Sequence, residues 1–242
     1  APAALAAAGP GGAAPPYTRI YLAPESEPPL RTAAAEIAAR TGASLVDRAH
    51  RGRILAGEVV LAAGRPEAQY PEAAAMVDAA VAEREWDLVK RDGEGLLIAG
   101  SSARNVCHAA LRWVENPAVE NEGVSTYRFA ERFTSWDNPL NQMYRFSREF
   151  DRRRHIRELA RMGHTAVEIN RYASAGGYFV RHRRFPDDSY TWYLSYAPAL
   201  DAFVESSLTQ GLYPRDELAA NLADLKEAAA IARSYGLKPG FV

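Results

Sequence analysis

The chain has little cysteine and no long apolar run. Cys107 is the only cysteine among 242 residues, so no disulfide can form within the chain and no zinc site with the usual cysteine spacing is available. No apolar run approaches the roughly 20 residues that span a bilayer, so we expect no membrane span. The 48% hydrophobic and 24% charged residues are near globular averages and predict a globular protein.

An excess of charge of one sign is also missing. Lysine and arginine total 29 against 30 aspartates and glutamates, a formal net charge of -1, so no overall positive field attracts a polyanion. Residues 145–184 do hold 11 arginines against 4 acidic residues. We interpret them as a solvated helix face, because no nucleic-acid-binding motif frames them. Nucleic acid is therefore not an expected partner.

Motifs for metals and cofactors are absent as well. The five histidines do not form H-x-x-x-H or another metal-ligand spacing. The run GSSARN, residues 100–105, lacks the G-x-x-x-x-G-K-[ST] pattern of a phosphate-binding loop. We expect no metal and no cofactor.

The first 16 residues, APAALAAAGPGGAAPP, are alanine, glycine and proline without hydrophobic periodicity, which is typical of a flexible tail. Such a tail fits what remains after signal-peptide cleavage, a linker or a cloning remnant. An extracellular or periplasmic location and a cytoplasmic one therefore both stay open.

Residues 17–125 are predicted to form a small α+β domain of packed layers. Strands are expected at 18–23, 43–46 and 58–64, with a hairpin over 86–100 turning at Asp92-Gly93. Helices are expected at 28–42, at 71–85 and at 101–116, the last capped by Ser101 or Ser102.

Residues 126–242 differ in composition, since positions 127–213 hold 17 of the 24 aromatic residues. The pattern predicts a helix at 151–163, a strand at 164–172, a helix at 214–236 and another strand from 237. This alternation is typical of parallel β/α units. A (β/α)₈ barrel takes about 250 residues, so we expect the first part of a barrel, with the chain stopping inside it. The predicted fold class is therefore α/β.

The segment RFTSWDNPLNQ, residues 132–142, combines an aromatic ring with polar side chains. A tryptophan face stacks on a sugar ring while polar groups bind its hydroxyls. The candidate substrate-binding residues here are Arg132, Trp136, Asp137 and Asn138. The alternative is an interdomain loop in which Trp136 is buried and Asp137 or Asn138 caps a turn.

A second group of candidates lies at the end of the strand predicted at 164–172. Glu168, Asn170 and Tyr172 share one side of that strand, and active sites of parallel barrels lie at the carboxyl ends of strands. For Arg171 two roles are open, contact with the substrate and a structural ion pair. The long aromatic loop 173–196 either walls a sugar-binding cleft or packs over the barrel rim.

Together these motifs resemble two glycoside hydrolase families. The domain ending in GLLIAG and SSARNVCHAALRWVEN resembles the α+β domain that precedes the barrel in family 20 β-hexosaminidases and family 67 α-glucuronidases. RFTSWDNP is similar to the stretch that leads into the α-glucuronidase barrel. Pro139, Leu140 and Asn141 depart from the glycine-containing continuation of that family, so the resemblance indicates glycoside hydrolases in general.

The resemblance implies a secreted, polysaccharide-degrading enzyme whose substrate is an oligosaccharide or glycoside and whose mechanism uses two carboxylic groups. In these families the two groups follow later strands, so we expect them beyond Val242 and expect residues 1–242 alone to be inactive. The alternative is a carbohydrate-binding or scaffolding protein without hydrolysis. The sugar, the linkage, retention or inversion, and the oligomeric state stay open.

Overall fold

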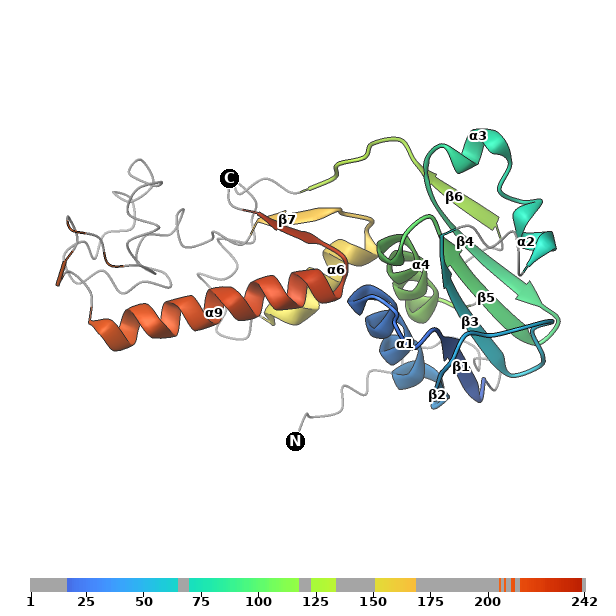
Figure 1. Cartoon of the computed structure of the whole chain (residues 1–242), viewed down its shortest axis with the longest axis horizontal. Helices are drawn as coiled ribbons and strands as arrows, with labels where there is room; N and C mark the ends of the chain where they lie inside the picture. Colours follow the sequence, from blue (N-terminus) through green and yellow to red (C-terminus); the bar gives the residue numbers. More distant parts are fainter. Residues whose placement is uncertain are drawn as a thin grey trace. The chain divides into compact units, whose positions relative to one another are not determined.

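The computed structural model describes residues 17–64, 70–117, 123–133, 151–168, 205, 207, 210–211 and 214–240 (Figure 1). The chain divides into two compact units, residues 1–130 and 131–242. It has a mixed α/β fold, as the sequence predicts, and its larger sheet has six strands. The tail predicted at 1–16 lies outside the described residues.

The first unit is built on this sheet, in the order β2-β1-β3-β5-β4-β6. The four strands β2, β1, β3 and β5 run parallel, and β4 and β6 are antiparallel to their neighbours. The strands are β1 Arg19–Leu22, β2 Ser44–Asp47, β3 Glu58–Ala63, β4 Glu85–Asp92, β5 Gly95–Gly100 and β6 Gly123–Tyr127. The sequence analysis did not anticipate β6, which spans the domain boundary expected between residues 125 and 126.

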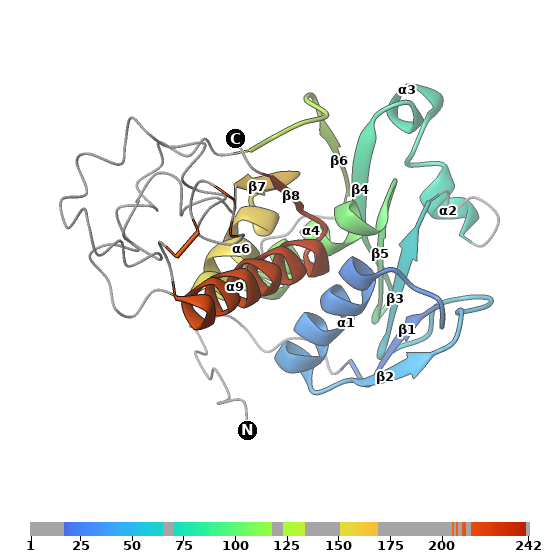
Figure 2. The same ribbon diagram turned by 60° about the vertical axis from the view of Figure 1, so that its left-hand side comes forward.

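Two helices, α1 (Pro28–Thr41) and α4 (Ala103–Glu115), pack against each other on one face of this sheet (Figures 1 and 2). Prolines begin α1, and Gly42 ends it with φ 77°, a conformation that favours glycine. Of the two serines proposed as cap of α4, it is Ser102 whose side chain accepts from the Asn105 amide. The helices thus begin and end where the sequence predicts.

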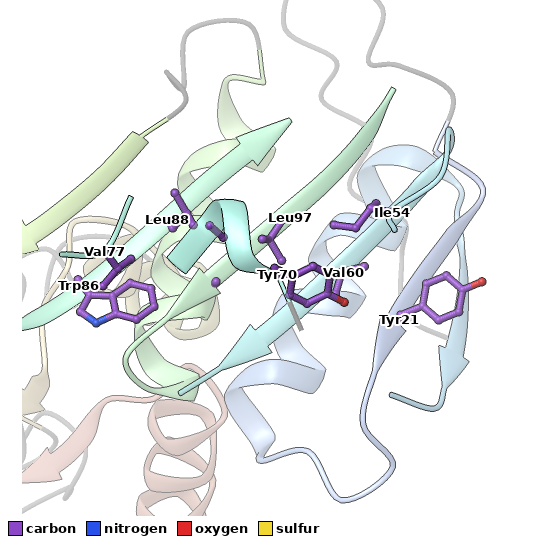
Figure 3. Close-up of a cluster of buried hydrophobic side chains, with 10 residues drawn as sticks. Tyr21, Ile54, Val60, Tyr70, Val77, Trp86, Leu88 and Leu97 are labelled. Atoms are coloured by element: carbon purple, nitrogen blue, oxygen red, sulfur yellow. The ribbon is translucent and has the colours of Figure 1, made fainter. Parts of the chain in front are cut away.

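The opposite face carries a second apolar layer. Side chains from four strands, among them Val60, Leu88 and Leu97, lie in one buried cluster with Tyr70 and Val77 of the segment that precedes β4 (Figure 3). Strand side chains alternate between faces, so the sheet is buried on both sides. This burial explains the near-continuous apolar runs of β3 and β5.

The prediction of one continuous helix over residues 71–85 is wrong. Two single turns stand in its place, α2 (Pro71–Ala74) and α3 (Ala79–Ala82). The side chain of Asp78 accepts from the Val81 amide and so begins a new helix. Between the two turns, Val77 is buried against the sheet, and this packing outweighs the helix propensity of the alanines.

The hairpin prediction is confirmed, because β4 and β5 pair antiparallel across Asp92 and Gly95, with Gly93 at φ 58°. Gly95 also has no space for a side chain. A Cβ there would lie 2.6 Å from the Ile54 side chain and 2.8 Å from the Leu55 carbonyl oxygen.

The second unit contains the helices and strands predicted for it. They are α6 Arg152–Arg161, β7 Ala166–Glu168, α9 Arg215–Ser234 and β8 Lys238–Gly240. Strands β7 and β8 pair in parallel. Helices α6 and α9 pack together, with Arg152 and Glu227 forming an ion pair of 3.9 Å between them.

Replacement of Leu96 by alanine should destabilise the protein by about 2–5 kcal/mol, because this side chain is fully buried in β5 and its loss leaves a cavity. Leu45→Ala is the matched control. Leu45 lies in the edge strand β2 and is 48% exposed, so its loss should cost under about 1 kcal/mol. Urea unfolding monitored by circular dichroism measures both, and equal losses would contradict this account of the core.

Candidate functional site

Of the substrate-binding residues predicted from the sequence, Arg132 and Glu168 lie within the described residues. The remaining candidates, and the aromatic loop 173–196, lie outside them; these candidates are Trp136, Asp137, Asn138, Asn170, Arg171 and Tyr172. Their contact with substrate stays a prediction. The described part of this region is the path from α6 into β7.

Residues close in sequence determine the course of the chain from α6 into β7. Asp151 begins α6, since its carboxylate accepts from the Arg154 amide. Ile156 and Leu159 bury one face of the helix. Gly163, at φ 84°, then turns the chain toward β7 in a conformation that favours glycine.

Arg132 is held against this path by backbone and side-chain contacts. Its amide donates to the Thr165 hydroxyl at 2.8 Å, and its carbonyl accepts from the Thr165 amide at 2.7 Å. Its guanidinium Nε donates to the carbonyl of Gly163. Arg132 therefore has a structural role at the start of β7, and substrate contact by the same side chain stays a prediction.

These contacts also place Arg132 beside the start of β7. The Ala166 amide donates to the Arg132 carbonyl at 3.3 Å, while the carbonyl of Thr165 accepts from the Lys238 amide at 2.9 Å. Arg132 and β8 therefore both contact the chain where β7 begins.

Glu168 is the last residue of β7, opposite Gly240 in β8. The two strands are parallel, so their carboxyl ends lie at the same edge of the pair. In parallel β/α folds this edge carries the ligand site. The sequence predicts Asn170, Arg171 and Tyr172 directly after it.

Two histidines near this path favour their neutral form. Burial, together with the neighbouring His164 and against the opposing charge of Glu158, lowers the pKa of His155 to about 4. Burial also lowers the pKa of His164, with Arg132 acting in the same direction and a hydrogen bond to the Leu159 carbonyl against it. Both rings are therefore suited to packing at neutral pH and not to holding an anion.

A polar centre that the sequence analysis did not single out lies in the first unit, around Glu58. This carboxylate is buried at the start of β3, and it accepts from the Tyr21 hydroxyl at 2.9 Å and from the Leu55 amide at 2.9 Å. The Nε2 atom of His50 lies 3.2 Å from it, and Nδ1 of the same ring lies 2.8 Å from the Tyr70 hydroxyl. Tyr21, Leu55 and His50 thus each bring a polar atom within hydrogen-bond distance of the carboxylate.

The charge states in this centre follow from the contacts. Burial acts to raise the pKa of Glu58, but hydrogen bonds from Leu55, Tyr21 and His50 together hold that pKa below its ordinary value. Burial and the Glu58 charge raise the pKa of Tyr70 to about 12. Tyr70 is therefore protonated at neutral pH, and its hydroxyl lies within hydrogen-bond distance of Nδ1 of His50.

A hydroxyl, an imidazole and a carboxylate in this order are also the parts of a nucleophilic triad. The hydroxyl of Tyr70 has a raised pKa and its residue is only 8% exposed, so it is a poor nucleophile. We interpret the centre as a rigid buried support. The sequence feature that could have indicated this centre is the basic run RAHRGR, residues 48–53, which contains His50.

Among the described residues, every helix is too short or too polar to span a bilayer. In the same part of the chain, no group of three or more histidine, cysteine, aspartate or glutamate side chains is arranged to hold a metal ion.

Comparison with known proteins finds no matching family model and no matching curated protein. The solved structure of CpGH84D is similar over 92% of this chain and 40% of its own, with a TM-score of 0.37 and 9% sequence identity. The chain thus spans less than half the length of that protein.

Thr165→Val should destabilise the second unit by about 1–3 kcal/mol, because it keeps the shape of the side chain but removes the hydroxyl that pairs with the Arg132 backbone. Thr165→Ser keeps the hydroxyl and is the control. Thermal unfolding of both variants measures the effect. A valine variant as stable as the serine variant would mean that this pair does not anchor Arg132.

His155→Gln tests the pH dependence of the second unit. The folded pKa of about 4 lies below the ordinary 6.5, so the unfolded chain binds the proton first and acid favours unfolding between these values. We expect wild type to lose stability relative to the glutamine variant from pH 7 to pH 5, by at most about 1.4 kcal/mol per pH unit. Urea unfolding of both proteins at the two pH values measures this difference, and a constant difference would contradict the assignment.

Proposed function

We propose that the chain is the N-terminal part of a glycoside hydrolase, with an α+β domain followed by the first β/α units of a (β/α)₈ barrel. The observation that carries this proposal is the arrangement in the second unit. Strands β7 and β8 are parallel neighbours with α9 between them in sequence, and α6 precedes β7, whose start Arg132 contacts. Such repetition of neighbouring parallel strands and helices builds a barrel.

The substrate class comes from the residues that the sequence places at the carboxyl ends of these strands. A segment with Trp136, Asp137 and Asn138 follows Arg132, and Asn170 and Tyr172 follow β7. Tryptophan and tyrosine rings stack on sugars, while amide and carboxylate groups bind sugar hydroxyls. An oligosaccharide fits this combination.

Catalysis needs two carboxylic groups on either side of the glycosidic bond. Glu168 is the acidic residue at the end of β7, and we assign it to substrate binding. We place the two catalytic groups beyond Val242, on later strands. Residues 1–242 should therefore bind a substrate without cleaving it.

Two measurements on the 242-residue chain test this proposal. We expect isothermal titration calorimetry with a panel of neutral and acidic oligosaccharides to detect binding, and we expect no release of nitrophenol from the matching nitrophenyl glycosides. Trp136→Ala should weaken the binding by at least about fivefold, since loss of a stacked aromatic ring removes about 1–3 kcal/mol. Phe129→Ala is the matched control, because Phe129 is a 64% exposed aromatic residue outside the predicted site.

Three results would count against the proposal. Turnover of a glycoside by this chain would place the catalytic groups within residues 1–242. If no saccharide binds, the proposed substrate class is wrong. If Trp136→Ala and Phe129→Ala weaken binding equally, the proposed site is wrong. Binding without cleavage by the chain extended past Val242 would favour the carbohydrate-binding alternative.

A further inference from the structure

A pocket of about 610 Å³ opens at the end of the sheet where β1 and β3 begin, beside the buried Glu58 centre. It lies between the first residues of β1 and β3 and the loop that connects β2 to β3. Four arginines are among its lining residues: Arg19, Arg48, Arg51 and Arg53. This concentration of arginine is the feature that points to a ligand.

The charges around the pocket do not balance. One carboxylate, that of Glu58, stands against four guanidinium groups, and guanidinium groups stay charged at any physiological pH. Within the part of the chain that the structure describes, no carboxylate lies within ion-pair distance of Arg48, Arg51 or Arg53. The pocket therefore has a positive excess.

Glu58 does not remove this excess, because its oxygens are already engaged. Tyr21, Leu55 and His50 supply hydrogen bonds to them, and the guanidinium of Arg19 lies 3.8 Å away. The side chain of Glu58 is only 4% exposed, so its carboxylate belongs to the floor of the pocket. Arg48, Arg51 and Arg53 therefore remain available to bind another anion.

The fold also positions the arginines. Gly52 adopts φ 87°, a left-handed turn that favours glycine, between Arg51 and Arg53. The guanidinium of Arg48 lies over the ring of Tyr21, 5.7 Å from its centre, where cation and ring attract each other. Three of the four arginines thus come from one short loop whose start rests on a buried side chain.

We propose that this arginine pocket binds the oxyanion of a small organic ligand. Guanidinium groups match both carboxylate and phosphate in a two-bond geometry. The volume falls within the roughly 300–1,000 Å³ of small-molecule sites and exceeds the space of a lone ion. The phosphate of a sugar phosphate and the carboxylate of a uronic acid share this chemistry.

This site lies in the first unit and is independent of the glycosidase proposal. The test is calorimetric titration of the 242-residue chain with glucose 6-phosphate, with glucuronate and with glucose, which is the uncharged match of both. We expect at least one of the two anions to bind at least about tenfold more tightly than glucose. That binding should weaken when sodium chloride rises from about 50 to about 300 mM, because salt screens exposed charges.

Arg51→Ala combined with Arg53→Ala should weaken binding of that anion by at least about tenfold. Both side chains are exposed, so the fold should survive the change, and a thermal melt checks this. Arg84→Ala is the matched control, since Arg84 is an exposed arginine of the same unit outside the pocket lining.

A tight anion that loses affinity in the double variant and keeps it in Arg84→Ala supports the proposal. Preference for glucose 6-phosphate identifies a phosphate ligand, and preference for glucuronate identifies a carboxylate. The proposal is overturned if no anion binds more tightly than glucose, or if the double variant binds the anion as wild type does. Trp136→Ala should leave this binding unchanged, so this proposal and the glycosidase proposal can fail separately.

Discussion

The buried carboxylate of Glu58 is the constraint on which the end of the sheet where β1 and β3 begin depends. A carboxylate removed from water is costly unless hydrogen bonds replace its hydration. Tyr21 on β1, the Leu55 amide and His50 supply those bonds, and Tyr70 in turn holds the outer nitrogen of His50. One charge thus ties together a strand, the loop that carries the arginines and the segment before α2.

Local chemistry decided which parts of the fold the sequence could predict. Asp92-Gly93, the prolines of α1 and Asp151 each determine a turn or helix end within a few residues, and the structure has these features. The helix expected at 71–85 was wrong because its alanines favour a helix while Asp78 and the burial of Val77 interrupt it. Strand β6 was missed because only Val124 and Tyr127 interrupt an otherwise small and polar run, and its pairing partner β4 decides its conformation.

The candidate sites depend on contacts between residues far apart in the sequence, which the sequence alone does not reveal. The polar residues that follow β7 in the sequence lie outside the described residues, so their place at a strand end stays a prediction. The anchoring of Arg132 could not be predicted, since its partner Thr165 is 33 residues away and the contact uses backbone groups that every residue has. The Glu58 centre likewise joins residues up to 37 positions apart, and nothing in the neighbourhood of each residue indicates the others.

The nearly balanced net charge of the sequence gives no sign of the arginine pocket. A balance of 29 basic and 30 acidic residues excludes a strong field around the whole molecule, but charges beyond about 10 Å are screened at ordinary ionic strength. A ligand in the pocket therefore experiences the nearby side chains, which are four arginines and one engaged carboxylate. Overall neutrality argues against a long polyanion, because a polyanion needs an extended positive surface. It leaves room for a small anion, whose binding depends on a few guanidinium groups within hydrogen-bond distance.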